Sequence, residues 1–299
     1  MLPSGSPAKE RISRPRPDRR PSPATQCEPA FRRIASGFLD DVAACHRATC
    51  AGDAIALHHM RVALTRLRAA IAFFSSMVDD AEWTRLKSEL KWLNGYLGAT
   101  RDLDVAIETS HGRPEKRIFG TARIESQRRL RRALQSDRYR QWFAAMSEWI
   151  ERGPWSASQD RRAARMRASP ASVFHAHGLA RWHDKLTKRS RGLQGMGKHK
   201  RHRLRLASKR LRYAIEFSQD ALATDDLPKW RTMVKHLRKG QQILGELNDA
   251  EIRRSLATSL AGPQERTATR DPGVLKLRDR KKKARLLRRA AVVYRKIAG

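Results

Sequence analysis

The sequence predicts an all-α protein built from two similar helical halves. Three observations lead to this prediction: Ala, Leu, Arg, Lys and Glu dominate, strand-like alternation is rare, and one helical motif occurs twice. The chain has 299 residues, of which 40% are hydrophobic. This composition is sufficient for a substantial core.

The expected helices lie between helix-breaking residues, from about residue 28 onward. They span 29–51, 54–78, 80–97, 103–110, 121–136, 138–151, 172–194, 198–219, 228–246, 249–260 and 274–297. Pro, Gly and Ser gather in the stretch after residue 151, as in a linker. The sequence therefore predicts a disordered, basic Pro/Arg-rich leader over 1–27, a first helical half over 28–151, a linker over 152–171 and a second helical half over 172–299.

The charge of the chain indicates a polyanionic partner. Lys and Arg number 64 against 30 Asp and Glu, so the net charge is +34. Such a balance favours nucleic acid, polyphosphate or an anionic membrane surface. Cys27, Cys45 and Cys50 form no C-x-x-C pair, and the longest apolar run, 69–74, is far too short to span a bilayer. We therefore expect a cytoplasmic protein with no transmembrane segment and no secretory signal.

The repeated motif is H-x-x-R-x-x-x-x-R-L-R. It occurs in "LHHMRVALTRLRAAIAFF" (57–74) and again in "KRHRLRLASKRLRYAIEF" (200–217), so that His58 corresponds to His202, 144 residues later. Downstream, "LNGYLGATRDLD" and "GQQILGELNDAE" share a Leu-Gly followed four residues later by an Asp. The same order of parts in both halves indicates an internal duplication.

The second copy of the motif is amphipathic in an unusual way. At 100° per residue, one arc holds Lys198, Arg201, His202, Arg205, Lys209 and Arg212, and the opposite side holds Leu204, Ala207, Leu211, Ala214 and Ile215. In the first copy, His58, Arg61 and Arg68 share a polar face. From His202 to Arg212 the basic stripe is about 15 Å long, which predicts an extended anionic ligand. Arg matches phosphate oxygens bidentately.

Other interpretations of these residues remain open. A charge run is usually a solvated face, although residues 54–78 contain no acidic side chain to pair with. After Leu-Gly, Asp102, Asp104 and Asp249 fit the N-cap of a following helix, with a ligand role as the alternative. Asp102 or Asp249 could also pair with a basic residue of the motif. Pairs such as His58-His59 lack the Cys or carboxylates of a zinc site, and no nucleophile, paired carboxylates or P-loop is evident. We expect no enzyme activity, no cofactor and no metal, and weak, non-specific nucleic-acid binding is the alternative function.

The two motif copies, "HRLRLASKRLRY" in full and "HHMRVALTRLR" in part, together with "LGATRDLDV" and "LGELNDAE", resemble the conserved histidine α-helical domain, known as CHAD. The resemblance covers roughly residues 29–297. It implies two four-helix bundles related by a pseudo-two-fold axis, with a basic central groove or pore that binds inorganic polyphosphate. Members of the family are also linked to polyphosphate granules.

By position, the resemblance implies specific ligand residues. They are His58, Arg61, Arg66 and Arg68 in the first half and His202, Arg205, Lys209, Arg210 and Arg212 in the second, to which the helical arc adds Lys198 and Arg201. Thr65 stands where the second half has Lys209, so we expect weaker binding by the first half. Many relatives carry a phosphohydrolase domain with acidic metal ligands, and the absence of such ligands here favours a non-catalytic protein. The basic segment at 276–299 is expected to be a final bundle helix, with contact to nucleic acid or to a granule surface as the alternative.

Overall fold

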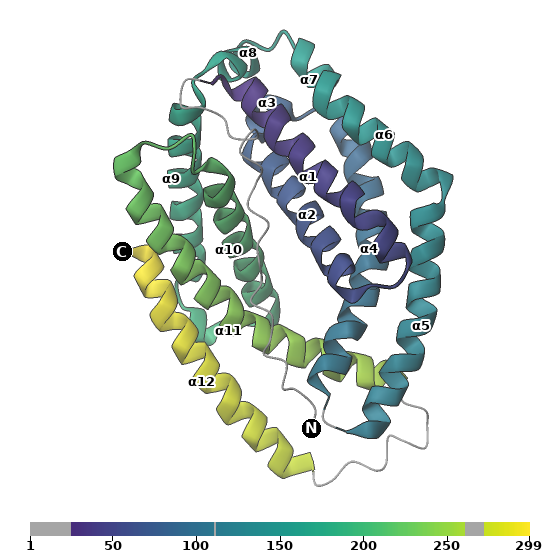
Figure 1. The fold of residues 1–299 in the computed structure, drawn as a ribbon. Helices are drawn as coiled ribbons and strands as arrows, with labels where there is room; N and C mark the ends of the chain where they lie inside the picture. Colours follow the sequence, from purple (N-terminus) through teal and green to yellow (C-terminus); the bar gives the residue numbers. More distant parts are fainter. Residues whose placement is uncertain (1–24, 111, 261–271) are drawn as a thin grey trace, which may run out of the picture.

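The computed structural model describes residues 25–110, 112–260 and 272–299, and over these ranges the chain is helical throughout apart from short connections (Figure 1). The long helices are α1 (Cys27–Cys50), α2 (Ala54–Phe73), α4 (Ala81–Thr109), α5 (Arg113–Gln135), α6 (Asp137–Arg152), α9 (Ala171–Ser190), α10 (Lys198–Ser218), α11 (Leu227–Leu260) and α12 (Pro272–Ala298). The shorter ones are α3 (Ser75–Val78), α7 (Pro154–Ala157), α8 (Arg161–Ala168) and the 3-10 turns η2 (Leu193–Gly195) and η3 (Thr224–Asp226). The all-α prediction is confirmed for this part of the chain, and residues 1–24 of the expected leader lie outside it.

Side-chain caps mark where several helices begin. Asp53 accepts hydrogen bonds from the backbone N–H groups of Ile55 and Ala56, at 2.7 and 3.0 Å, at the start of α2. Asp80 does the same for Trp83 at the start of α4, at 2.6 Å. These carboxylates satisfy backbone donors that have no partner inside the helix and favour the positive end of its dipole.

Helices from the two parts of the chain pack into one body. In the first part α1 packs on α2 and α5, and α4 packs on α5; in the second, α9 packs on α10 and α12, and α11 packs on α12. Between the two parts, α2 lies against α10 and α4 against α11 (Figure 1). Most of the buried apolar side chains of both parts belong to one contiguous cluster. The motif helices α2 and α10 therefore meet at the centre of the molecule.

Aromatic side chains fill the contact between the two parts near the C-terminal ends of α2 and α10. The ring centroid of Phe73 lies 5.5 Å from that of Phe217 and 5.2 Å from that of Trp182. Gly178 on α9 allows this close approach, because a Cβ at that position would lie 2.5 Å from the Phe73 ring. The packing fixes α9 and α10 against α2 and so fixes the relative position of the two motif copies.

Two pairs of expected helices are continuous in the structure. The segments expected at 80–97 and 103–110 form α4, and those expected at 228–246 and 249–260 form α11. Gly98 and Gly245 therefore lie inside helices, and the interpretation of Asp102, Asp104 and Asp249 as N-caps is wrong. A glycine inside a helix costs only about 1 kcal/mol relative to alanine, which packing readily offsets.

The segment between residues 152 and 171 contains the short helices α7 and α8. The Trp155 side chain is almost fully buried there, and its indole N–H donates to the carbonyl of Trp149 at 2.7 Å. Arg167 donates to the carbonyls of Trp155 and Ser158 at 2.9 and 2.6 Å. The connection between the two halves is thus packed onto the helices around it, and the division of the chain into halves at this segment stays a prediction.

Candidate functional site

Basic side chains from both motif copies come together between α2 and α10. Lys209 on α10 is largely buried, and this burial, together with the charges of Arg205, Arg61 and Arg212, lowers the pKa of Lys209 to about 8. Burial also lowers the pKa of Arg61 on α2, and the charges of Arg101 and Arg205 act in the same direction. Basic side chains from the two halves are thus close enough to interact electrostatically. We call Arg61, Arg205 and Lys209 the central cluster.

Backbone carbonyls hold Arg61 in place. The Arg61 Nη1 donates to the carbonyl oxygens of Leu97 and Gly98 on α4, at 3.3 and 3.1 Å, and lies 3.8 Å from an oxygen of Asp102. In the second half, the Nε of Arg205 is buried and finds no hydrogen-bond partner among the described residues. Buried donors in proteins are normally paired, so Arg205 presents a donor suited to an external anion.

A second group of basic residues lies further along the same helices. Arg212 donates to Gln241 and Glu216, both at 3.0 Å, and its guanidinium lies 4.4 Å from the Tyr213 ring centroid. Arg66 from the first half reaches the same carboxylate at 3.9 Å. Glu216 thus links α2 to α10 and neutralises part of the charge of Arg66 and Arg212.

Four further ligand residues were expected in this region: His58, Arg68, His202 and Arg210. Arg68 and Arg210 are exposed overall, but partial desolvation of the Arg68 guanidinium, followed by the charge of Arg210, lowers the pKa of Arg68. His202 is exposed, whereas His58 is half-buried, with its ring centroid 6.0 Å from that of His59. The two histidines precede Arg61 and Arg205 by one helical turn and lie at the N-terminal side of the central cluster.

Arg201 and Lys198 have another partner. The Arg201 side chain is buried and donates to the carbonyl of Met196 at 2.6 Å and to Glu251 on α11 at 2.9 Å. Lys198 lies 3.8 Å from the same glutamate. Although the helical arc groups Arg201 with Arg205, its guanidinium is used to join the start of α10 to α11.

The two aspartates that follow the Leu-Gly of each half, Asp102 and Asp249, lie near each other. Asp102 is half-buried beside Arg61, and the pKa of its carboxyl is raised. Burial is the main cause, and the charge of Asp249 on α11 acts in the same direction, while Arg61 opposes the shift. Asp249 acts electrostatically on Lys209 as well. Asp102 and Asp249 therefore place two mutually repelling carboxylates beside the central cluster. For Asp102, the sequence-based expectation of a partner in the motif is confirmed by Arg61.

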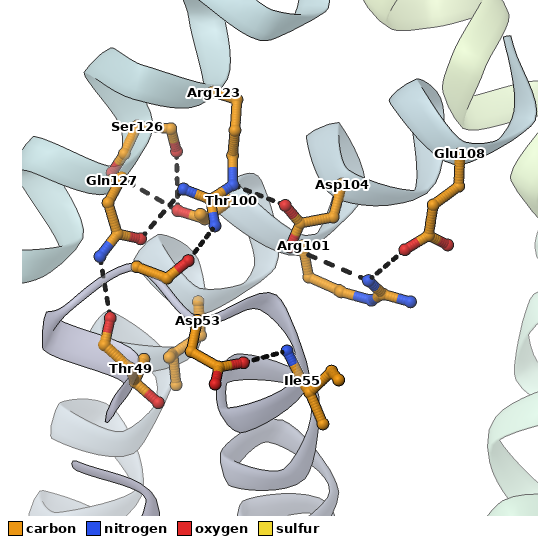
Figure 2. A network of polar contacts seen from close by, with 12 residues as sticks. Thr49, Asp53, Ile55, Thr100, Arg101, Asp104, Glu108, Arg123, Ser126 and Gln127 are labelled. Carbon is orange, nitrogen blue, oxygen red and sulfur yellow. Dashed lines mark hydrogen bonds and ion pairs between the residues drawn. The ribbon is translucent and has the colours of Figure 1, made fainter. Parts of the chain in front are cut away.

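Asp104 belongs instead to a structural network that joins α4, α5 and the loop before α2 (Figure 2). Arg123 on α5 donates to Asp104 at 2.6 Å and to the carbonyl of Gly52 at 3.2 Å. Gln127 donates to the carbonyl of Thr49 at 2.8 Å. This network holds α4 and α5 against the C-terminal end of α1 and the loop that precedes α2.

Sequence reasoning missed Tyr213, Glu216, Gln241 and Glu251 as neighbours of the basic stripe. Glu216 carried a usable signal, since it is the only acidic residue of α10 and follows Arg212 by four positions, the spacing of a helical ion pair. Gln241 and Glu251 had no such signal, because their contacts with α10 span 29 and 50 residues.

Within the described part of the chain, no helix is long and apolar enough to cross a membrane. In the same ranges, no group of three or more His, Cys, Asp or Glu side chains is arranged to hold a metal ion.

Comparison with known proteins identifies the family. Residues 33–258 match the family model of the CHAD domain. No curated protein matches the chain. Among solved structures, the chain is similar to the crystal structure of the CHAD domain from the plant Ricinus communis, with a TM-score of 0.70 and 24% identity over 91% of this chain and 89% of that one. At this identity the likeness supports the fold, while the family model covers most of the chain. The protein therefore belongs to the CHAD domain family.

Proposed function

We propose that this protein binds inorganic polyphosphate between α2 and α10, without catalysing a reaction. The observation that carries the proposal is the central cluster: Arg61 from one motif copy lies close enough to Arg205 and Lys209 from the other for their charges to interact. Crowded cations repel one another, and a bound polyanion relieves this repulsion at several positions at once.

The helix contacts support a pseudo-two-fold arrangement of two four-helix bundles. The contacts of α1 with α2 and α5 recur for α9 with α10 and α12, and that of α4 with α5 recurs for α11 with α12. We infer that the axis runs between α2 and α10, so that equivalent residues such as Arg61 and Arg205 face one shared groove or pore. A flexible phosphate chain fits such a site because its phosphates are equivalent, so that any of them can bind to any of the basic groups.

The chemistry of the site favours a bare phosphate chain over nucleic acid. Recognition of single strands usually adds aromatic side chains on which bases stack. The stripe from Lys198 to Arg212 has no aromatic residue, and the adjacent Tyr213 is only 3% exposed. Cytoplasmic association with polyphosphate granules follows as a proposal from the family and from the binding activity.

Nucleic-acid binding remains a second candidate because of a separate observation on α12. Between residues 280 and 299 there is no acidic residue, and the exposed basic residues are Arg280, Lys281, Lys282, Lys283, Arg285, Arg288, Arg289, Arg295 and Lys296. Other surface arginines pair along their helices, such as Arg85 with Glu82 and Arg152 with Glu148. A stripe of this kind, with no acidic residue between 280 and 299, suits the backbone of a duplex.

The decisive experiment removes the two arginines of the central cluster. In Arg61→Ala/Arg205→Ala, we expect the affinity for long-chain polyphosphate at near-physiological salt to fall about 100-fold or more, since two charge-assisted hydrogen-bonding groups are removed. Arg162→Ala/Arg165→Ala on α8 is the matched control, because both arginines lie outside the cluster and the change in net charge is the same. Circular dichroism checks that helicity is retained.

Competition completes the test. If duplex or single-stranded nucleic acid displaces polyphosphate at equal phosphate concentration, the second candidate replaces the first. Unchanged polyphosphate affinity in the folded Arg61/Arg205 variant would reject this site. Release of phosphate from polyphosphate on addition of Mg²⁺ or Mn²⁺ would contradict the absence of catalysis.

A further inference from the structure

Asp102 and Asp249 are acidic residues placed beside the cluster that is proposed to bind an anion. They occupy the same position after the Leu-Gly of each half, one on α4 and one on α11, and the charge of Asp249 acts on Asp102. Their charges oppose that of any phosphate in the central cluster. A simple receptor for polyanions would have no carboxylates at this place.

Helix formation does not account for these carboxylates. Both residues lie inside continuous helices, α4 and α11, where no N-terminal backbone donors need a cap. The structural acid of this region is Asp104, which Arg123 holds at 2.6 Å. Asp102 and Asp249 are thus not needed to start a helix or to join α4 to α5.

Asp102 pairs with Arg61, but two backbone carbonyls hold Arg61 more closely. The guanidinium of Arg61 donates to the carbonyls of Leu97 and Gly98 at 3.3 and 3.1 Å, whereas the nearest oxygen of Asp102 is 3.8 Å away and acts on Arg61 mainly through its charge. The side chain of Asp249 accepts a hydrogen bond from the neutral amide of the neighbouring Asn248 at 3.3 Å, which is a long contact. Both carboxylates are therefore loosely held counter-charges.

Such counter-charges discriminate between anions by length. A single phosphate in the central cluster is repelled by both carboxylates and attracted by only the few cations around it. A long chain extends to Arg66, Arg68, Arg210 and Arg212, so the same repulsion is spread over many more favourable contacts. Specificity often depends on a repulsive element of this kind, directed against the unwanted ligand.

We propose that Asp102 and Asp249 are selectivity residues that exclude short phosphates from the site and so set the minimum length of chain that it holds. This inference rests on the proposed polyphosphate function. Asp102 opposes anions next to Arg61 and Asp249 next to Lys209, one from each half. Together they keep the site available in the presence of abundant small anions such as inorganic phosphate.

The test compares ligands of different length in one variant. Asp102→Asn/Asp249→Asn removes both charges and keeps the shape of both side chains. We expect its affinity for tripolyphosphate to rise about tenfold or more, and its affinity for long-chain polyphosphate to rise only about two- to threefold, measured by isothermal titration calorimetry. Asp137→Asn/Glu148→Gln, which replaces two exposed acids of α6, is the control for the same change of net charge. The control should leave the ratio of the two affinities unchanged.

Three results would overturn the inference: an unchanged ratio of affinities in the double variant, a loss of affinity for both ligands, or an equal gain in the control. A loss for both would mean that the aspartates position the basic residues. If the double variant does not fold, Asp249→Asn alone gives the same test, because that residue has the weaker ties. Failure of the wild-type protein to bind long polyphosphate would reject the proposed function instead. A gain in the affinity of the variant for tripolyphosphate could still be measured in that case, so the two failures can be distinguished.

Discussion

Lys209 sits where the two halves of the protein bring their charges closest. Arg61 acts on it from α2, Arg205 and Arg212 flank it on α10, and Asp249 acts on it from α11. Burial and the three arginines lower its pKa from 10.5 to about 8, and Asp249 offsets part of this shift. Part of the Lys209 population is therefore neutral at slightly alkaline pH, unlike the arginines around it.

This pKa predicts proton-linked binding. An anion favours the charged amine and raises its pKa, so above pH 8 the protein must take up a proton to bind, and affinity falls as pH rises from 8 toward 10. Below pH 7 Lys209 is already charged and contributes no pH dependence. We expect Lys209→Arg, which keeps a charge throughout, to show a flatter affinity profile between pH 8 and 10 in titrations with long-chain polyphosphate. Identical profiles for the two proteins would show that another group titrates.

At the scale of the helices, the site depends on how closely α9 and α10 approach α2. Gly178 and the Phe73 ring are in contact where these helices cross, and Phe217 and Trp182 surround the same ring. Further along, Arg66 from α2 shares Glu216 with Arg212 from α10. Apolar packing and a shared carboxylate thus together hold two like-charged helix faces near each other.

Gly178→Ala should disturb this approach. The new methyl group would lie 2.5 Å from a ring that is enclosed by other aromatic side chains, so we expect the free energy of unfolding to fall by about 1–3 kcal/mol. Gly95→Ala on α4 is the matched control, because nothing lies within 4 Å of the added carbon and a helix gains about 0.5–1 kcal/mol from this change. Chemical denaturation of both variants checks the prediction. Equal stability of the two variants would contradict the close packing of α9 on α2.

At the scale of the whole molecule, positive charge is arranged on two separate surfaces. The central cluster lies between α2 and α10, while the outward side of α12 carries its own stripe at the edge of the molecule (Figure 1). The inward side of α12 contains Tyr294, whose hydroxyl bonds Ser208 on α10 at 2.5 Å. Burial raises the pKa of Tyr294 to about 12, so this hydroxyl stays protonated at neutral pH. The helix is thus anchored by one face and charged on the other.

The two surfaces predict separable binding. Replacing Lys281, Arg285, Arg288 and Arg295 by Gln removes charge from the outward side of α12, where all four are exposed. We expect the affinity for duplex DNA to fall. In a plot of the logarithm of affinity against the logarithm of salt concentration, the slope should become shallower by about one for each phosphate that the variant no longer neutralises. Affinity of this variant for polyphosphate should change by less than about threefold. The Arg61→Ala/Arg205→Ala variant should show the reverse pattern, with the larger loss in polyphosphate affinity. Equal decreases for both ligands would mean that both polyanions use one continuous surface.

Several features of the fold could be predicted from the sequence because they depend on local periodicity. The apolar sides of α2 and α10 are buried as the helical arc predicts, with Leu204, Leu211 and Ile215 inward on α10. The all-α class also follows from spacings within single helices, and the two motif copies carried the resemblance to the CHAD family. The continuity of α4 and α11 through Gly98 and Gly245 did not follow, because a glycine signals a helix end or a helix interior depending on what packs around it.

The sequence by itself determined which side of each motif helix is basic, since that depends only on the 100° step between neighbouring residues. Only the tertiary structure decided which of these basic groups remain available. Arg201 and Arg205 share the same arc, yet Arg201 is committed to Glu251, whereas Arg205 keeps a buried donor without a partner in the described chain. Likewise Asp104 is held by Arg123 and Asp102 lies beside the central cluster. The physical reason is that a charge is neutralised by whatever lies within a few ångströms, and for these residues the partner comes from another helix.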